Sequence, residues 1–173
     1  MGCQFVPTSD VRSVEAAEFR QAMRNLASGV AVVATGANAE RRGLTVSSVT
    51  SLSLDPPCLL VSVNLTSETH DAILANGRFG VSLLGDGHQD MAMRFAGQEG
   101  VKGVRRFETA PWEQGILNVP LLRSAISALE CVLHHHHVVG THGLFVGRIV
   151  ATREGKGDPL VNHQGALRTF PPA

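Results

Sequence analysis

Two long runs of β-branched and apolar residues, 125–139 and 144–152, are separated by only four residues, Gly140-Thr141-His142-Gly143. A short glycine-flanked link of this kind forms a tight corner, so the two runs predict a long antiparallel hairpin. Shorter runs of the same character occur at 30–35, 44–54, 58–63, 79–84 and 159–162. Because these runs do not alternate regularly with long helices, the pattern predicts a closed or nearly closed antiparallel barrel rather than a doubly wound sheet.

A few short helices accompany these strands. Ser13 is expected to cap the first helix, and Gly29 is expected to end it. Its apolar face would consist of residues spaced as on a helical surface, Phe19, Ala22, Met23 and Leu26. Residues 71–76 and 86–95 predict two further short helices, and the irregular stretch 97–115 is expected to be a surface excursion.

The chain is expected to form one domain over residues 13–173, preceded by a flexible tail over residues 1–12, which lack periodicity. Fifteen basic residues balance fifteen acidic ones, which argues against a nucleic-acid binder that uses a broad basic field. No apolar run reaches the length of a membrane helix. Cys3, Cys58 and Cys131 lie far apart in the sequence, as free thiols in a cytoplasmic protein do.

The segment 45–53 is unusual because six of its nine side chains carry hydroxyl groups. Asp55-Pro56-Pro57 follows it and ends the strand, since proline cannot donate to a ladder. The segment is interpreted either as a solvent-facing strand or as a phosphate site built from hydroxyl groups and backbone N–H groups. No glycine-rich phosphate loop, nucleophile elbow or zinc motif occurs elsewhere in the sequence.

Histidines form the second group of candidates. Residues 134–137 are four consecutive histidines, but no acidic or thiol partner is near in sequence, which favours a solvated strand end and no metal site. His142 lies at the glycine-flanked corner, where it is either an ordinary turn residue or a side chain aimed at a ligand. Phe95 and Cys131 are most simply explained as buried core residues.

Taken in order, several of these segments resemble the short flavin reductases of two-component monooxygenases, a flavin-reductase-like group with an FMN-binding split barrel. The resemblance spans residues 18–168. Its most specific part is the serine-rich strand that ends in two prolines, residues 43–57. The other matching segments are Phe19-Arg20-Gln21-Ala22-Met23, Ser28-Gly29-Val30-Ala31-Val32-Val33, Arg94-Phe95-Ala96-Gly97, Leu129-Glu130-Cys131, Gly140-Thr141-His142, Leu144-Phe145-Val146-Gly147 and Asp158-Pro159-Leu160.

The resemblance implies a mainly β, six-stranded antiparallel Greek-key split barrel, a homodimer, and a flavin groove near the dimer interface. It places His142 beside the nicotinamide as the catalytic residue. It also implies a set of cofactor-binding residues: Thr45, Val46, Ser47, Ser48, Val49, Ser51 and Leu52 at the flavin ring and phosphate, Ser67, Glu68 and Thr69 near the phosphate or ribityl chain, Phe95 in the flavin pocket, and Asn162, His163, Gln164 and Gly165 along the nicotinamide nucleotide.

Two positions depart from the family pattern. Thr141 replaces the aspartate that often precedes the histidine, and Leu167 replaces an aromatic residue that often follows the glycine near the C-terminus. The departures bear on how His142 is oriented and on what stacks against the nicotinamide or adenine.

The implied activity is hydride transfer from NADH to FAD, with FMN as the alternative flavin. The reduced flavin would then diffuse to a separate monooxygenase or halogenase. NADH is favoured over NADPH because no arginine cluster lies near Asn162 in the sequence.

Two other functions remain open. One is an oxidase similar to the pyridoxamine-phosphate oxidase group, which usually needs several basic residues at its phosphate, whereas only Arg41 and Arg42 are close to the serine-rich segment. The other is a non-catalytic flavin- or heme-binding barrel.

Overall fold

The computed structural model describes residues 11–170, so most of the expected N-terminal tail, together with Cys3, lies outside the described residues. The elements follow in chain order: α1 (Ala16–Met23), β1 (Ser28–Gly29), β2 (Ala31–Thr35), η2 (Asn38–Glu40), β3 (Arg42–Val46), β4 (Thr50–Leu54), β5 (Pro57–Asn64), α2 (Glu68–Asn76), β6 (Arg78–Leu83), α3 (Gln89–Phe95), η3 (Gly103–Thr109), β7 (Trp112–Gln114), β8 (Pro120–Leu122), β9 (Ser127–Val139), β10 (His142–Glu154), β11 (Val161–His163) and β12 (Ala166–Arg168).

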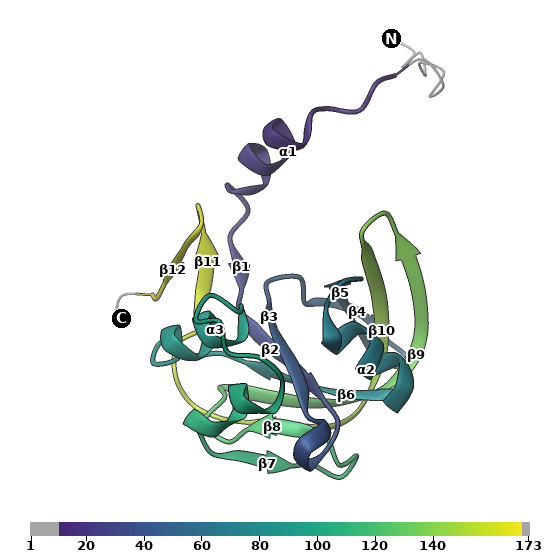
Figure 1. Cartoon of the computed structure of the whole chain (residues 1–173), viewed down its shortest axis with the longest axis vertical. Coiled ribbons are helices and arrows are strands. Elements are labelled where there is room, and N and C mark those ends of the chain that lie inside the picture. Colours follow the sequence, from purple (N-terminus) through teal and green to yellow (C-terminus); the bar gives the residue numbers. More distant parts are fainter. Residues whose placement is uncertain (1–10, 171–173) are drawn as a thin grey trace.

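A seven-stranded antiparallel sheet dominates the molecule, with the strand order β3-β2-β6-β9-β10-β5-β4. The predicted hairpin is confirmed as β9 and β10, which form its long curved arm in Figure 1. The two edge strands of this order, β3 and β4, are consecutive in the chain and are linked by residues 47–49. The two ends of the sheet are therefore connected at this link.

The expected count of six strands is wrong, because the single strand predicted over 44–54 is divided into β3 and β4. The cause is the hydroxyl group of Ser48, which donates to the carbonyl of Ser62 at 3.0 Å and accepts from its N–H at 3.2 Å. One side chain thus takes both hydrogen bonds of a backbone position on β5. Side-chain bonds of this kind compete with a regular ladder, and the strand is interrupted there.

Two apolar clusters lie on opposite faces of β2, whose five residues are all buried. The inner cluster is covered by α2 and consists of Ala31, Val33, Val46, Leu59, Val61, Val63, Ile73, Phe79, Val81, Cys131 and Phe145. The outer cluster is covered by α3 and η3 and consists of Val30, Val32, Ala34, Leu84, Met91, Ala92, Phe95, Phe107, Leu122, Ala125 and Leu160. The short side chains of β2 alternate between the two clusters, so this strand is the wall that separates them.

The stretch 97–115 is more than a surface excursion. It contains η3 and β7, and Phe107 is buried within it. The Phe107 ring lies 5.0 Å from that of Phe95 and 4.9 Å from that of Trp112, measured between centroids. β7 pairs with β8, and β12 pairs with β11; the sequence did not predict β7, β8 or β12. These strands have three residues each, too few for a visible alternation.

Helix α1 differs from its expectation at both ends. It begins at Ala16 after Glu15, without a side-chain cap, and it ends at Met23, well before Gly29. None of its residues is buried, and the predicted apolar face is exposed at Phe19 (55%) and Met23 (44%). Figure 1 shows α1 standing away from the body of the molecule.

Among residues 11–170, no helix is long and apolar enough to cross a membrane.

Candidate functional site

The link between β3 and β4 lies across a cavity from the turn between β11 and β12. A cavity of about 890 Å³ is lined on one side by Ser47, Ser48 and Val49, and on the other by Asn162, Gln164 and Gly165. A neighbouring cavity of about 540 Å³ is lined by Thr45, Val46 and Ser47, again with Asn162 and Gly165. Both volumes fall within the range of small-molecule sites. The structure thus brings together two groups of predicted residues that are more than a hundred positions apart in sequence.

Helix α1 and the residues after it form another wall of the larger cavity. Phe19, Arg20, Met23 and Arg24 line it. Arg24 holds the β11–β12 turn in place: its Nη2 donates to the carbonyl of Gln164 at 2.6 Å, and its own carbonyl accepts from the N–H of Gln164 at 2.9 Å. Two arginines therefore line the same cavity as Asn162, although the sequence around Asn162 shows no such cluster.

Thr45 connects the smaller of these cavities to the outer cluster. Its hydroxyl donates to the carbonyl of Ala92 at 2.6 Å and so ties β3 to α3. Ala92, Met93 and Ala96 line the same cavity, whereas the adjacent Phe95 is 1% exposed and points into the outer cluster. Phe95 therefore supports the cavity from behind and does not line it in this chain.

A third cavity of about 220 Å³ lies at the other end of β3. Thr66, Ser67, Glu68 and Thr69 line one side, at the start of α2. Ser67 caps this helix by accepting from the N–H of Thr69 at 3.2 Å. The opposite side carries three cationic side chains, Arg42, Lys102 and Arg106. Cationic groups and a helix N-terminus around one small cavity favour an anionic ligand.

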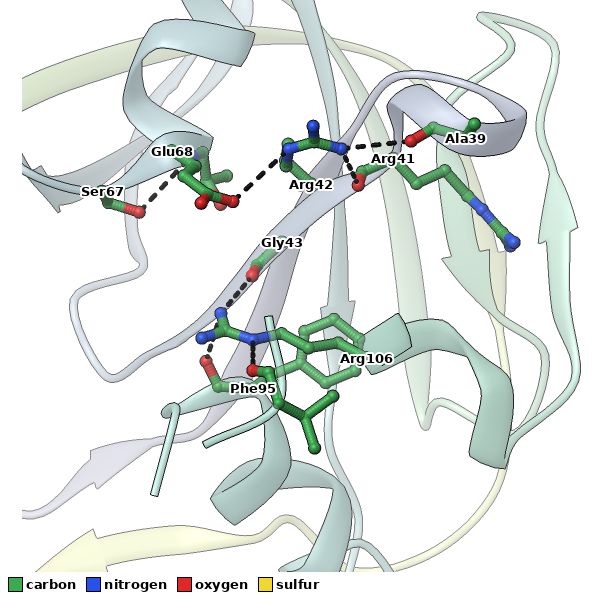
Figure 2. A network of polar contacts seen from close by, with 10 residues as sticks. Ala39, Arg41, Arg42, Gly43, Ser67, Glu68, Phe95 and Arg106 are labelled. Carbon is green, nitrogen blue, oxygen red and sulfur yellow. Dashed lines mark hydrogen bonds and ion pairs between the residues drawn. The ribbon is translucent and has the colours of Figure 1, made fainter. Parts of the chain in front are cut away.

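The two guanidinium groups of this cavity are held by backbone carbonyls (Figure 2). Arg106 Nη1 donates to the carbonyls of Gly43 at 2.9 Å and Phe95 at 3.2 Å. Burial lowers the pKa of Arg106 from its ordinary value, and nearby Glu68 acts in the opposite direction. Arg42 Nε lies 3.5 Å from the carboxylate of Glu68, the anion that partly balances the local positive charge. This carboxylate is mostly exposed, so it can move away when another anion enters.

β3 connects the third cavity with the other two. Arg42 and Gly43 line the cationic cavity, and Thr45 and Val46 line the cavity beside the β11–β12 turn. Three residues along a strand span about 10 Å. The arrangement suits an elongated ligand with an anionic group at one end and a less polar body along β3.

The remaining predicted residues lie elsewhere in the single chain. Ser51 and Leu52 are exposed on β4, and His163 lines a separate cavity with Phe170. His142 is the first residue of β10, at the corner of the β9–β10 hairpin, and lines none of the three cavities. Figure 1 shows this hairpin across the molecule from β11 and β12. The Thr141 hydroxyl group contacts Nδ1 of His142 at 2.9 Å and so orients this ring.

Sequence reasoning missed Arg20, Arg24, Lys102 and Arg106. Each lies in a segment whose sequence pattern predicts a helix or an irregular loop and does not indicate a binding site. Arg106 is more than sixty residues from the strand whose carbonyl it binds, so only the tertiary structure shows the cationic cavity. Within residues 11–170, no group of three or more His, Cys, Asp or Glu residues is arranged to hold a metal ion.

Comparison with known proteins gives one consistent result. The flavin reductase like domain family matches residues 23–171. The NADH-dependent FMN reductase AsuE2 of Streptomyces nodosus subsp. asukaensis is 39% identical over 155 residues, which cover 88% of this chain and 84% of that protein.

Two solved structures are also similar. BorF, the flavin reductase component of a bacterial two-component tryptophan halogenase, superposes with a TM-score of 0.84 at 33% identity, covering 92% of this chain and 100% of BorF. The NADH:FAD oxidoreductase SgcE6 of Streptomyces globisporus C-1027, in complex with NAD and FAD fragments, has a TM-score of 0.83 at 29% identity and covers 98% of both chains. Fold, cavities and sequence agree, and this chain belongs to the flavin reductase like domain family.

Proposed function

We propose that this protein is an NADH:flavin oxidoreductase that reduces FAD or FMN and releases the reduced flavin to a separate oxygenase or halogenase. The observation that carries the proposal is the arrangement of the three cavities along β3. Two of them lie between the start of the 47–49 link and the β11–β12 turn, and the third, cationic cavity lies at the other end of the strand. The names of similar proteins include an NADH-dependent FMN reductase and an NADH-dependent FAD reductase, and one similar structure contains NAD and FAD fragments. These names support a flavin and NADH as the two substrates.

Flavin and NADH, when bound, supply the hydride chemistry, and the protein supplies binding, orientation and electrostatics. Arg42, Arg106 and the N-terminus of α2 would hold the flavin phosphate. Thr45 to Val49 would hold the body of the flavin, and Asn162 to Gly165 would hold the nicotinamide nucleotide. This division fits the geometry because the anion-binding groups are at one end of β3 and the less polar cavity walls are at the other.

We further propose that the chain works as a homodimer. Helix α1 has no buried residue, and Phe19, Met23 and Leu26 are about half exposed. Val138 and Val139 near the hairpin corner, and Leu52 and Leu54 on β4, are exposed too. A second copy would cover apolar surface of this extent and would bring another His142 toward the cavities. The cytoplasmic location and the diffusion of reduced flavin remain predictions.

The activity is tested by following NADH oxidation at 340 nm with purified protein and added FAD, and then with added FMN. Rapid oxidation that depends on free flavin is expected, and the flavin with the higher kcat/KM identifies the preferred substrate. Measurable flavin binding without NADH oxidation would overturn the proposal in favour of a flavin-binding barrel.

His142→Ala is expected to reduce NADH oxidation at saturating flavin by about tenfold or more, because misplacing the nicotinamide lowers the rate of hydride transfer. The flavin Kd should change little. His134→Ala is the matched control, since His134 is an exposed histidine on the same hairpin. Equal turnover in the two variants would remove His142 from the reaction.

Arg42→Ala is expected to weaken flavin binding by about 10–100-fold, the loss of one charge-assisted hydrogen bond. Arg41→Ala is the control, because the Arg41 guanidinium lies over the Phe107 ring, 5.0 Å from its centroid, and points away from the cavity (Figure 2). Flavin binding is measured by fluorescence quenching. Riboflavin, which lacks the phosphate, should bind both variants alike, and a selective loss of riboflavin binding in Arg42→Ala would contradict the assignment.

A further inference from the structure

Two histidines from distant parts of the chain meet beneath the β9–β10 hairpin. His70 is on α2 and is 6% exposed, and His136 is on β9 within the run of four histidines. Their ring centroids are 5.3 Å apart, and both rings pack against the ring of Phe145. The buried side chain of His70 and the partly exposed side chain of His136 therefore meet between α2 and the hairpin.

The Nε2 atoms of both rings are buried, and neither has a hydrogen-bond partner among the described residues. A buried nitrogen without a partner costs free energy comparable to a lost hydrogen bond, so two such atoms at one location call for a ligand.

Gly143 shows where that ligand would lie. A Cβ atom at this position would be 2.7 Å from Nε2 of His70 and 2.7 Å from Nε2 of His136. Both nitrogens thus lie close together against the same side of Gly143 on β10. The φ angle of Gly143 is not positive, so its backbone conformation does not demand glycine. The close approach of the two rings explains the glycine, because any larger residue would clash with both nitrogens.

The protonation of His70 suits metal binding. Its Nδ1 lies 2.9 Å from the carboxylate of Asp71, which can only accept, so Nδ1 carries the proton and Nε2 presents its lone pair. A carboxylate that orients a histidine in this way is the usual second partner of a metal-bound imidazole.

We propose that His70 and His136 bind a divalent cation of the imidazole-preferring class, such as Zn²⁺ or Cu²⁺, through their two Nε2 atoms beside Gly143, with water completing the coordination. Two imidazole nitrogens and no carboxylate in contact select this class over Mg²⁺ and Ca²⁺. The cation joins α2, whose N-terminus borders the cationic cavity, to the hairpin that carries His142. Cation binding at this site does not require flavin, so it can be tested independently of the proposed activity.

Zn²⁺ is titrated into chelator-treated protein in competition with a chromophoric chelator. One equivalent is expected to bind to the wild type. His70→Gln and His136→Gln should each weaken this binding at least tenfold, and Asp71→Asn by about tenfold through loss of the orienting carboxylate. The control is the double variant His134→Ala/His135→Ala, which removes exposed histidines of the same run and should bind Zn²⁺ like the wild type.

Gly143→Ala provides a second variant that keeps every histidine and places a methyl group directly against both Nε2 atoms. It should abolish the tight equivalent, with circular dichroism showing that the chain stays folded. With Cu²⁺ in place of Zn²⁺, the electron paramagnetic resonance spectrum should show coupling to two imidazole nitrogens. Absence of a bound equivalent in the wild type, or its loss in the His134→Ala/His135→Ala variant but not in His70→Gln, would overturn the proposal.

Discussion

The two faces of β2 bury similar apolar side chains in different ways. The inner cluster is built from regular elements: β2, β5, β6, β9, β10 and α2 all contribute to it. The outer cluster draws much of its bulk from irregular or short segments, including Phe107 in η3, Leu122 in β8 and Leu160 before β11. The cavity of about 540 Å³ borders the outer cluster through Val30 and Ala92, and it contacts the inner cluster through Val46. The regular face thus provides a rigid wall, and the irregular face provides the surface that can be shaped around a ligand.

Phe79→Ala and Phe95→Ala test this division most strongly. Each removes a fully buried ring and should lower the free energy of unfolding by about 3–5 kcal/mol, as measured by urea denaturation. Only Phe95→Ala should also weaken flavin binding, because its neighbours Ala92, Met93 and Ala96 line the cavity. An equal loss of flavin affinity in Phe79→Ala, measured where both variants are folded, would show that the two faces are not separable.

Ser67→Ala is expected to have a smaller effect, about 1 kcal/mol of unfolding free energy, because Ser67 caps the helix that covers the inner cluster. Ser67→Gly should cost only a few tenths of a kcal/mol, since glycine is tolerated at this position. Helix α3, over the outer cluster, begins at Gln89, and the preceding His88 provides no side-chain cap. Flavin-free protein is used, so that any contact of Ser67 with a phosphate does not enter the result. Equal losses in the two variants would count against the cap.

The smallest expected effect is a pH dependence of the unfolding free energy that arises from His88, beside the outer cluster. Burial lowers the pKa of His88 from its ordinary 6.5, and the carboxylate of Asp86 opposes this shift. The unfolded chain therefore takes up the proton first, and stability decreases as the pH falls below about 6.5 toward the lowered folded value. Above the unfolded pKa this contribution is constant.

In the wild type, the N–H of Gly85 donates to Nδ1 of His88 at 2.9 Å. His88→Gln should flatten the decrease in stability, because glutamine does not titrate and its amide oxygen can still accept this hydrogen bond. Unfolding free energies at pH 5.5 and 7.5 give the comparison. The same pH dependence in wild type and variant would assign the effect to other groups, of which His136 is one, because its pKa is lowered too.

The inner face could be predicted from the sequence, whereas only the strands of the outer face and the burial of Phe95 could be. The runs that form β5, β6, β9 and β10 are long enough for their alternation to be visible, and burial of Cys131 in this face is confirmed, with the pKa of its thiol raised to about 12 by burial, Cys58 and Glu130. Phe107 and Trp112 belong to segments without periodicity, so no local pattern could show that they pack around Phe95.

The candidate site follows the same rule. The serine-rich strand could be predicted from its local pattern, but its interruption could not. The interruption depends on the hydroxyl group of Ser48, which forms hydrogen bonds with the backbone of Ser62 on another strand. Likewise, pairs of histidines could be proposed only within the run 134–137. The partner of His136 is His70, which comes from another element 66 positions earlier.

The strand order has a consequence for how fast this chain folds. β5 pairs with β10, so Cys58 is opposite Arg148, and this pairing joins residues that are 90 positions apart in the sequence. Closing so large a loop costs entropy before any contact repays it, and sheets of this topology fold on the scale of milliseconds to seconds. During that interval the unpaired edges of β5 and β10 would be exposed to other chains, so synthesis at high concentration should favour aggregation, and a slower rate of synthesis should raise the yield of folded protein.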